Sequence, residues 1–229
     1  MGSPRQVLVS PERLPGWVER FSAGNGGLTP ADGFDDDARL RGGLMLRGAN
    51  GCVAVLYPPG ESARESAGES ARHSAEQGPV QPTVDGLVAS ATSPRLIGLV
   101  LVRRGGYAVG VADQGKLVAS KTGTKYVQSR TAAGGWSQQR FARRRANQAA
   151  GLVDAAAVHA ARLFSEHAPD CLQLGGDRTL ASETLANPVL RSSQSLPQLT
   201  FLVVPDPRLD ILKQAAIDAR SIRITITDP

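Results

Sequence analysis

The chain has 229 residues, 41% of them apolar, which is enough for one substantial domain or for a medium domain with a small companion. Only two cysteines occur, Cys52 and Cys171, in no metal-ligand spacing, so we expect two buried thiols and neither a disulfide framework nor a zinc site. The longest apolar run, 96–102, is far shorter than the roughly 20 residues of a membrane span, and the amino terminus leaves no room for a signal peptide. We therefore expect a cytoplasmic protein with no membrane partner.

Positive charge is concentrated in one part of the chain. The net charge is +5 and the isoelectric point is about 9.7. Residues 114–153 contain no Asp or Glu, and we call this stretch the basic segment. Its cations are Lys116, Lys121, Lys125, Arg130, Arg140, Arg143, Arg144 and Arg145. A solvated helix face usually mixes both signs of charge, so the segregation favours a polyphosphate partner such as RNA.

A low-complexity stretch divides the chain. Residues 60–93 open with a four-residue repeat rich in Glu, Ser and Ala and contain no aromatic residue. Such a composition buries too little apolar surface to offset the entropy of ordering it. We therefore predict a flexible linker or insertion over 60–93, with a solvated helix built on Glu and Arg at period four as the alternative. This leaves a small α+β module over 1–59 and a larger domain over 94–229.

The elements in the first module follow from apolar periodicity. We predict a strand over 6–9, a helix near 11–21, and strands near 40–46 and 52–57. The larger domain begins with three strands joined by short turns, over 96–103, 107–112 and 116–122. A long helix starts near Ser137, and Pro169 and Asp170 end it. The remainder alternates: strand 171–174, helix 178–185, strand 199–204, helix 207–220 and strand 222–227.

An antiparallel meander followed by alternating helices and strands predicts an α/β fold with a mixed sheet covered by helices. This is the element order of ribonuclease-H-like folds. The middle domain of eukaryotic and archaeal release factors has the same fold.

The residues around the start of the long helix carry a family resemblance. They are Lys125-Tyr126-Val127, Arg130 and Gly134-Gly135-Trp136-Ser137-Gln138, followed by an Arg-rich helix. They resemble the Vms-like release factors, which include tRNA hydrolases of eukaryotic ribosome quality control and shorter bacterial peptidyl-tRNA hydrolases. The resemblance covers about residues 94–228. It implies cleavage of peptidyl-tRNA on the large ribosomal subunit, without a cofactor, by a loop glutamine that places water on the ester carbonyl.

The loop departs from the pattern of ordinary release factors. Their Gly-Gly-Gln tripeptide is absent, because Trp136 and Ser137 stand between Gly135 and the first glutamine. Matching the last glycine and the first glutamine to those of the family makes Gln138 the candidate catalytic residue. Gln139 remains the alternative through a shift of one residue.

The residue types fit this chemistry. Gly134 and Gly135 allow backbone conformations closed to other residues and let the main chain approach a crowded RNA surface. A glutamine amide can orient water but cannot act as a general base. Trp136 either stacks on a base or packs beneath the loop. The expected RNA-binding residues are Lys121, Lys125, Arg130, Arg140, Arg143, Arg144 and Arg145, of which Arg140 and Arg144 share one helix face.

Two other functions are also compatible with the sequence. A non-catalytic RNA- or ribosome-binding factor would use the same loop and arginines for docking alone. A metal-dependent ribonuclease-H-like nuclease would need converging carboxylates, for which the nearby candidates are Asp113, Asp154 and Asp177. His159 lies beside the apolar stripe of the long helix, so we expect it to pack rather than to catalyse. Because the loop has to enter a narrow ribosomal site, we expect a monomer.

Overall fold

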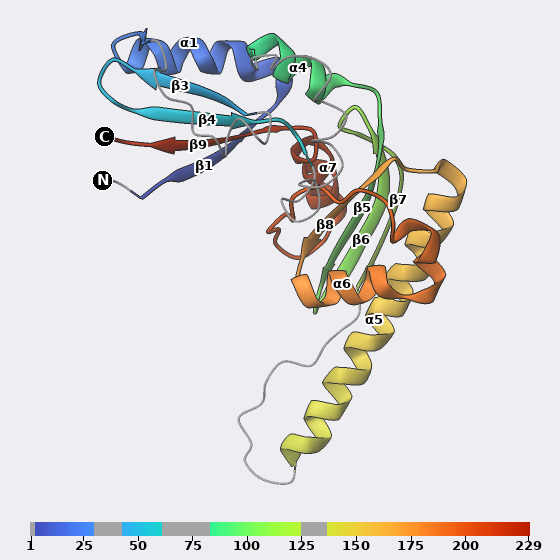
Figure 1. Cartoon of the computed structure of the whole chain (residues 1–229). Coiled ribbons are helices and arrows are strands. Elements are labelled where there is room, and N and C mark those ends of the chain that lie inside the picture. The colour runs from blue at the N-terminus through green and yellow to red at the C-terminus, as the bar shows by residue number, and fades with distance from the viewer. Residues whose placement is uncertain (1–2, 30–42, 61–82, 125–136) are drawn as a thin grey trace. The chain divides into compact units, whose positions relative to one another are not determined.

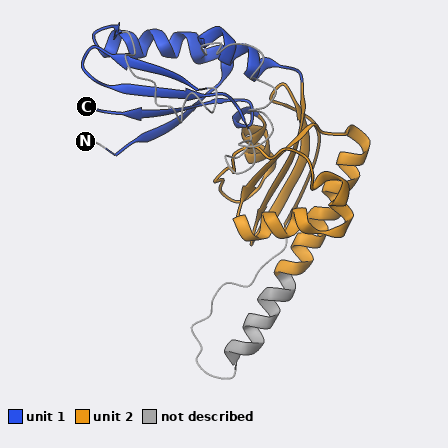
Figure 2. Cartoon of the chain, viewed as in Figure 1, with its two compact units in different colours: residues 1–94, 217–229 blue, residues 95–216 orange. Residues whose placement is uncertain are grey.

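The computed structural model describes residues 3–29, 43–60, 83–124 and 137–229, with the side chains of the last range described from Ala149 onward. The chain divides into two compact units (Figure 2). Unit 1 comprises Met1–Pro94 together with Ile217–Pro229, and unit 2 comprises Arg95–Ala216. Each unit has its own sheet and its own hydrophobic core.

Unit 1 is built on an antiparallel sheet. In its described part the strand order is β1-β9-β4-β3-β2. The strands are β1 (Arg5–Val9), β2 (Leu28–Thr29), β3 (Leu44–Gly48), β4 (Val53–Tyr57) and β9 (Ile222–Thr227). Burial alternates along the inner strands β9 and β4, where every second side chain is buried, as a sheet with one covered face requires.

Helices cover that buried face of the unit 1 sheet (Figure 1). They are the short 3-10 helix η1 (Pro11–Arg13), α1 (Leu14–Gly24) and α4 (Val84–Thr92). Leu14 and Phe21 from α1 and Leu87 from α4 pack in one core with Leu56 and Ile224 of the sheet. Unit 1 therefore folds around its own apolar cluster.

Helix α4 corrects the predicted linker over 60–93. Residues 61–82 lie outside the described residues, but the last part of that range is helical and belongs to the unit 1 core. The Thr83 hydroxyl accepts a hydrogen bond of 3.0 Å from the Gly86 amide, which is a helix N-cap. Leu87 and Ala91, four residues apart on one face, are buried. Averaging the composition over the whole stretch concealed this short amphipathic helix.

Unit 2 contains a mixed sheet, and the α/β fold class predicted from the sequence is confirmed. Among the described residues the strand order is β7-β6-β5-β8. The strands β5 (Leu96–Arg103), β6 (Gly106–Asp113) and β7 (Lys116–Thr124) form the predicted antiparallel meander, and β8 (Cys171–Gly176) pairs parallel to β5. Strands β5 and β6 are buried along almost their whole length, because both faces of the sheet are covered.

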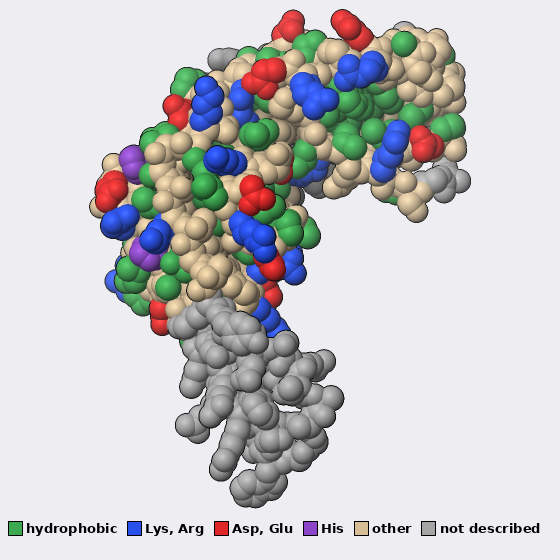
Figure 3. All heavy atoms as spheres, turned by 180° about the vertical axis from the view of Figure 1, so that it is seen from behind, with side chains coloured by type: hydrophobic (Ala, Val, Ile, Leu, Met, Phe, Trp, Pro, Cys, Tyr) green, Lys and Arg blue, Asp and Glu red, His purple; other side chains and the backbone are tan. Residues whose placement is uncertain are grey.

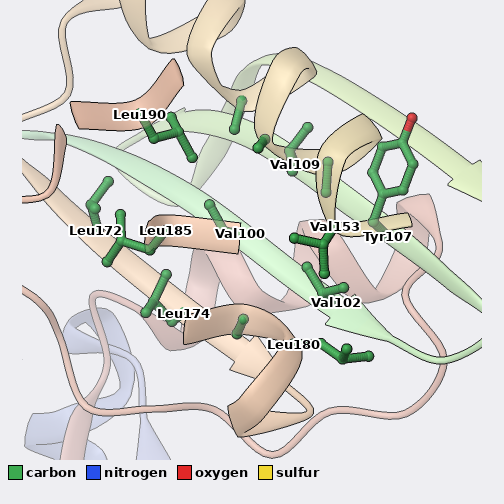
Figure 4. Close-up of a cluster of buried hydrophobic side chains, with 14 of the residues drawn as sticks. Val100, Val102, Tyr107, Val109, Val153, Leu172, Leu174, Leu180, Leu185 and Leu190 are labelled. Atoms are coloured by element: carbon green, nitrogen blue, oxygen red, sulfur yellow. The ribbon is translucent and has the colours of Figure 1, made fainter. Parts of the chain in front are cut away.

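One face of this sheet is covered by α5 (Ser137–His167), α6 (Arg178–Ala186) and the 3-10 helix η2 (Pro188–Ser193). Figure 4 shows side chains of these helices gathered with those of the strands, among them Val153, Leu185 and Leu190 around Val100. Phe164 of α5 lies so close to Gly98 that a Cβ atom there would come within 2.8 Å of its ring. Helix α7 (Leu209–Asp218) lies on the other face, where its Leu212 is 3.2 Å from the position of a Cβ at Gly110.

Two predicted strands differ from the structure. The segment predicted as strand 199–204 runs beside β8 but is not a regular strand. The pairing there consists of the isolated parallel bridges Leu172↔Gln198 and Gly175↔Leu202, in a stretch bounded by Pro197 and Pro205. Strand β9 was predicted within the larger domain, but it pairs antiparallel with β1 and β4 in the sheet of unit 1. Unit 2 therefore ends at Ala216 rather than at 229, and the small module is completed by the end of the chain.

Candidate functional site

The predicted catalytic loop leaves unit 2 between β7 and α5. Residues 125–136 lie outside the described residues, and these include Lys125, Arg130, Gly134, Gly135 and Trp136. Helix α5 begins at Ser137, as predicted, which places Gln138 and Gln139 in its first turn. The side chains of these two glutamines, and of Arg140, Arg143, Arg144 and Arg145 in the following turns, also lie outside the described residues. Lys121 is described and is exposed on β7.

The strand that leads into the loop is held firmly at its end. Thr124, the last residue of β7, pairs with Gly106, and Gly123 pairs with Tyr107. The Tyr107 ring lies directly over Gly123, since a Cβ there would come within 2.5 Å of the ring. Glycine is therefore required at this position for the aromatic ring to cover the end of the strand.

The helix that follows the loop is held on the same sheet. From Ala149 onward its buried side chains are spaced as one helix face: Leu152, Val153, Ala156, Ala157, Ala160, Leu163 and Phe164. His159 on this helix stacks on Tyr107, with ring centroids 5.9 Å apart and planes 23° apart, so it packs as expected. Burial raises the pKa of the Tyr107 phenol above its usual 10.0, in keeping with a side chain that packs rather than titrates. Tyr107 thus holds the end of β7 and the second half of α5 in one aromatic cluster.

The sheet edge from which the loop departs is also where the parallel strands end. Strands β5 and β8 run in the same direction, and β6 begins beside the end of β5. Since Thr124 pairs with Gly106, the loop starts at this carboxyl edge. Open α/β sheets bind their ligands outside the carboxyl ends of the strands, so this edge is the place where a functional loop is expected.

Two arginines outside the predicted set of RNA-binding residues lie at this edge. Arg103 at the end of β5 donates a hydrogen bond of 2.9 Å to the Val204 carbonyl, and its Nε lies 4.0 Å from a carboxylate oxygen of Asp206. The Arg178 guanidinium lies 4.4 Å from the centre of the Phe201 ring. The only signal in the sequence was the Arg-Arg-Gly-Gly turn at 103–106, which also fits an ordinary hairpin.

The carboxylates considered for a metal site have structural roles. Asp177 is the N-cap of α6, accepting hydrogen bonds from the Thr179 and Leu180 amides. Asp154 accepts a hydrogen bond from the Asn187 side chain, and Asp113 ends β6 at the next hairpin. Within the described ranges no group of three His, Cys, Asp or Glu side chains could hold a metal ion. The described geometry therefore does not assemble the metal centre of a nuclease.

The described surface carries charges of both signs. Figure 3 shows Lys and Arg side chains interspersed with Asp and Glu on the face seen there. The segregation of positive charge is a feature of the sequence of the basic segment, of which residues 125–136 and the side chains of 137–148 lie outside the described residues. Both cysteines are buried, as predicted. No helix in the described part of the chain is long and apolar enough to cross a membrane.

The family of actinobacterial and chloroflexi VLRF1 release factors matches residues 95–225. The chain belongs to this family. The match begins at the first strand of unit 2 and includes the loop, Gln138 and Gln139. The resemblance to Vms-like release factors is therefore confirmed, and with it a role in translation.

Similar solved structures include one titled the Vms1 mitochondrial localization core. It is 11% identical with a TM-score of 0.38, and the alignment covers 85% of this chain and 84% of that one. Another is the archaeal translation termination factor aRF1, 14% identical with a TM-score of 0.38, covering 94% of this chain and 64% of that one. A comparison with curated proteins gave no match.

Proposed function

We propose that this release factor hydrolyses the ester that joins a nascent peptide to tRNA on the large ribosomal subunit, rescuing stalled ribosomes. The observation that carries the proposal is the position of Gln138. It lies in the first turn of α5, directly after the glycine-containing loop and inside the region matched by the release-factor family. We also propose that the protein is cytoplasmic. We propose further that it acts as a monomer, because the loop has to enter a narrow ribosomal site.

The proposed reaction is attack of water on the ester carbonyl carbon. The Gln138 amide offers a donor and an acceptor and does not titrate, so it orients the water rather than taking its proton. The new C–O bond forms as the bond to the ribose oxygen of the tRNA breaks. The water hydroxyl stays on the peptide and the proton passes to the ribose oxygen through RNA groups of the substrate. Holding water and ester in attack geometry can contribute on the order of 7 to 11 kcal/mol in the best intramolecular cases.

The start of α5 supports this chemistry in a second way. The first four backbone N–H groups of a helix have no acceptor within the helix, and the helix dipole is positive there. Helix α5 is 31 residues long and begins one residue before Gln138. Negative charge that develops on the carbonyl oxygen would therefore be stabilised beside the first turn.

The anchoring of the loop supports the proposal because catalysis by positioning needs a rigid base. Gly123 and Tyr107 fix the end of β7, and the Tyr107–His159 stack joins that point to α5. A displacement of about 1 Å at a reacting group can cost roughly 100-fold in rate. The cluster would limit such displacement at the end of β7, where the loop begins.

The decisive measurement is peptide release from purified large-subunit nascent-chain complexes. We expect release by the natural chain and a loss of about 100-fold in Gln138→Ala. Gln139→Ala tests the alternative assignment, and Gln148→Ala, farther along the same helix, is the matched control that should keep full activity.

Three results would change the proposal. Full release by Gln138→Ala with loss in Gln139→Ala would move the catalytic role by one residue. Full release by both variants would exclude a glutamine mechanism. No release by the natural chain, with salt-sensitive subunit binding intact, would identify a non-catalytic ribosome-binding factor.

A further inference from the structure

The sheet of unit 1 has a second face that the helices described for this unit do not cover. Paired residues of an antiparallel sheet point to the same side, so the register defines this face. We call it the open face, and its members are Gln6, Leu8, Thr29, Met45, Arg47, Val53, Val55, Tyr57, Arg223, Thr225 and Thr227. All of them are partly or largely exposed, whereas their neighbours Ala54, Leu56, Ile222 and Ile224 are buried on the helix side.

An aromatic residue and an arginine form a pair on two inner strands, at one end of the open face. Tyr57 on β4 lies opposite Arg223 on β9, and these are inner strands of the sheet. Burial lowers the pKa of the Arg223 guanidinium, and the nearby Tyr57 acts in the opposite direction. The guanidinium remains charged at pH 7 all the same, because arginine is effectively always protonated in proteins. A permanent positive charge is thus held beside a phenol ring on the open face.

The rest of the open face combines positive charge, hydrogen-bonding groups and exposed apolar groups. Arg47 on β3 is exposed, and Leu8 on β1 has a relative exposure of 42%. Thr225, Thr227, Thr29 and Gln6 supply hydroxyl and amide groups. None of the face's eleven members is acidic. Asp228, which follows β9 directly, is engaged by the Cys52 thiol at 3.7 Å.

We propose that the open face of unit 1 binds single-stranded RNA, with one base on Tyr57 and with phosphates on Arg223 and Arg47. Flat sheets with an aromatic residue and neighbouring arginines recognise unpaired bases by stacking and their phosphates by charge. Threonine hydroxyls beside them can bond the 2′-hydroxyl groups or base edges that distinguish RNA. This site is distinct from the loop of unit 2 and does not depend on the proposed hydrolysis.

Other anionic partners fit the face less well. A lipid surface is recognised by clusters of about four to eight cations, and the open face carries two arginines. An acidic peptide would pair with those arginines but would leave the apolar groups of Met45, Val55 and Tyr57 uncovered. RNA uses both the charges and the flat partly apolar surface, because every base presents a planar ring beside a phosphate.

Photo-crosslinking locates the site in the full chain. The probe is a 12-nucleotide RNA of mixed sequence containing 4-thiouridine, and adducts are mapped by mass spectrometry after tryptic digestion. We expect an adduct on the peptide between Arg47 and Arg64, which contains Tyr57. Adducts confined to peptides of unit 2 would overturn the proposal.

Binding of the same RNA, measured by fluorescence anisotropy, tests the individual side chains. It is measured in the Arg140→Glu/Arg144→Glu background, so that the basic segment contributes little. We expect Tyr57→Leu to weaken binding about 5-fold or more and Tyr57→Phe to keep it, because stacking needs the ring alone. Circular dichroism confirms that each variant is folded.

A charge-matched pair completes the test. Arg47→Gln should lower the slope of log affinity against log salt by about 0.7, the value for one phosphate contact to a single strand. Arg20→Gln removes an exposed arginine from α1, on the opposite side of the sheet, and should leave the slope unchanged. Equal slopes for the two variants, or equal competition by a poly-glutamate peptide, would overturn the assignment to RNA.

Discussion

The ring of Tyr107 on β6 stacks on the imidazole of His159 on α5, with centroids 5.9 Å apart. The same Tyr107 ring covers Gly123, next to the last residue of β7. One side chain therefore connects the strand before the predicted catalytic loop to the helix after it. Its burial and its neutral phenol suit a packing role rather than a chemical one.

Gly123→Ala should damage both the fold of this cluster and the release activity. The added methyl group would lie 2.5 Å from atoms of the Tyr107 ring, so the ring or the end of β7 has to move. Overpacking of this kind costs about 1–3 kcal/mol of unfolding free energy. Gly105→Ala in the neighbouring turn is the control, because nothing lies within 4 Å of its Cβ position. Denaturant unfolding and peptide release would be compared, and equal behaviour of the two variants would contradict the cluster's role.

His159→Ala should have a milder effect in the same direction. Losing one partner of a stacked aromatic pair costs about 0.5–1.5 kcal/mol beyond the buried area. Val158→Ala on the adjacent helix position changes a residue that is 55% exposed, so it should be nearly neutral. Thermal unfolding measures the difference between the two variants. A His159→Ala variant as stable as Val158→Ala would show that the stack contributes nothing.

Local patterns in the sequence predicted most of unit 2. The continuous apolar run of β5, the turns at 104–106 and 113–115, and the spacing of Leu152 and Ala156 each specify their element without distant partners. Local patterns could not assign strand β9 to its sheet. Its alternating Ile222, Ile224 and Ile226 would suit either sheet, and only the pairing with β1 and β4 assigns it to unit 1.

For the candidate site, too, the sequence predicted some residues and not others. The residue types and their order pointed to Gly135 and Gln138, because the family resemblance is local in sequence. The cluster of Tyr107, Gly123 and His159 could not be predicted, since it depends on sheet register and on where α5 crosses the sheet. The same holds for the edge position of Arg103.

Gln173→Met should destabilise unit 2. Gln173 is 1% exposed, and its amide donates hydrogen bonds to the carbonyls of Leu174 and Thr200, at 2.9 and 2.8 Å. The second bond ties the irregular stretch after Pro197 to β8, so methionine of similar size leaves a part-buried carbonyl without this donor. We expect a loss of about 1–3 kcal/mol by urea unfolding. Gln214→Met, at an exposed position on α7, should stay within about 0.5 kcal/mol of the natural chain.

The stability of unit 1 should fall in alkaline solution through Cys52. Burial, and then Asp228, raises the pKa of the Cys52 thiol above the 9.0 of a free thiol. The unfolded chain therefore releases this proton first, so the contribution is present below pH 9.0 and is lost as the pH rises through the folded pKa. Unfolding free energies measured between about pH 8 and pH 10.5 should decline more steeply for the natural chain than for Cys52→Ala. Parallel curves would contradict this coupling.

Arg140→Glu combined with Arg144→Glu should abolish binding to large ribosomal subunits without unfolding the protein. The two positions share one face of α5 at i and i+4, so reversing both replaces attraction to RNA phosphates by repulsion along the helix. Arg162→Glu with Arg191→Glu makes the same change in net charge at exposed positions outside the basic segment and should still cosediment with subunits. Each phosphate contact that is lost should also reduce the salt dependence of binding, by about 0.7–0.9 in the logarithmic slope. If the first variant cosediments as well as the second, the basic segment is not the surface that reaches ribosomal RNA.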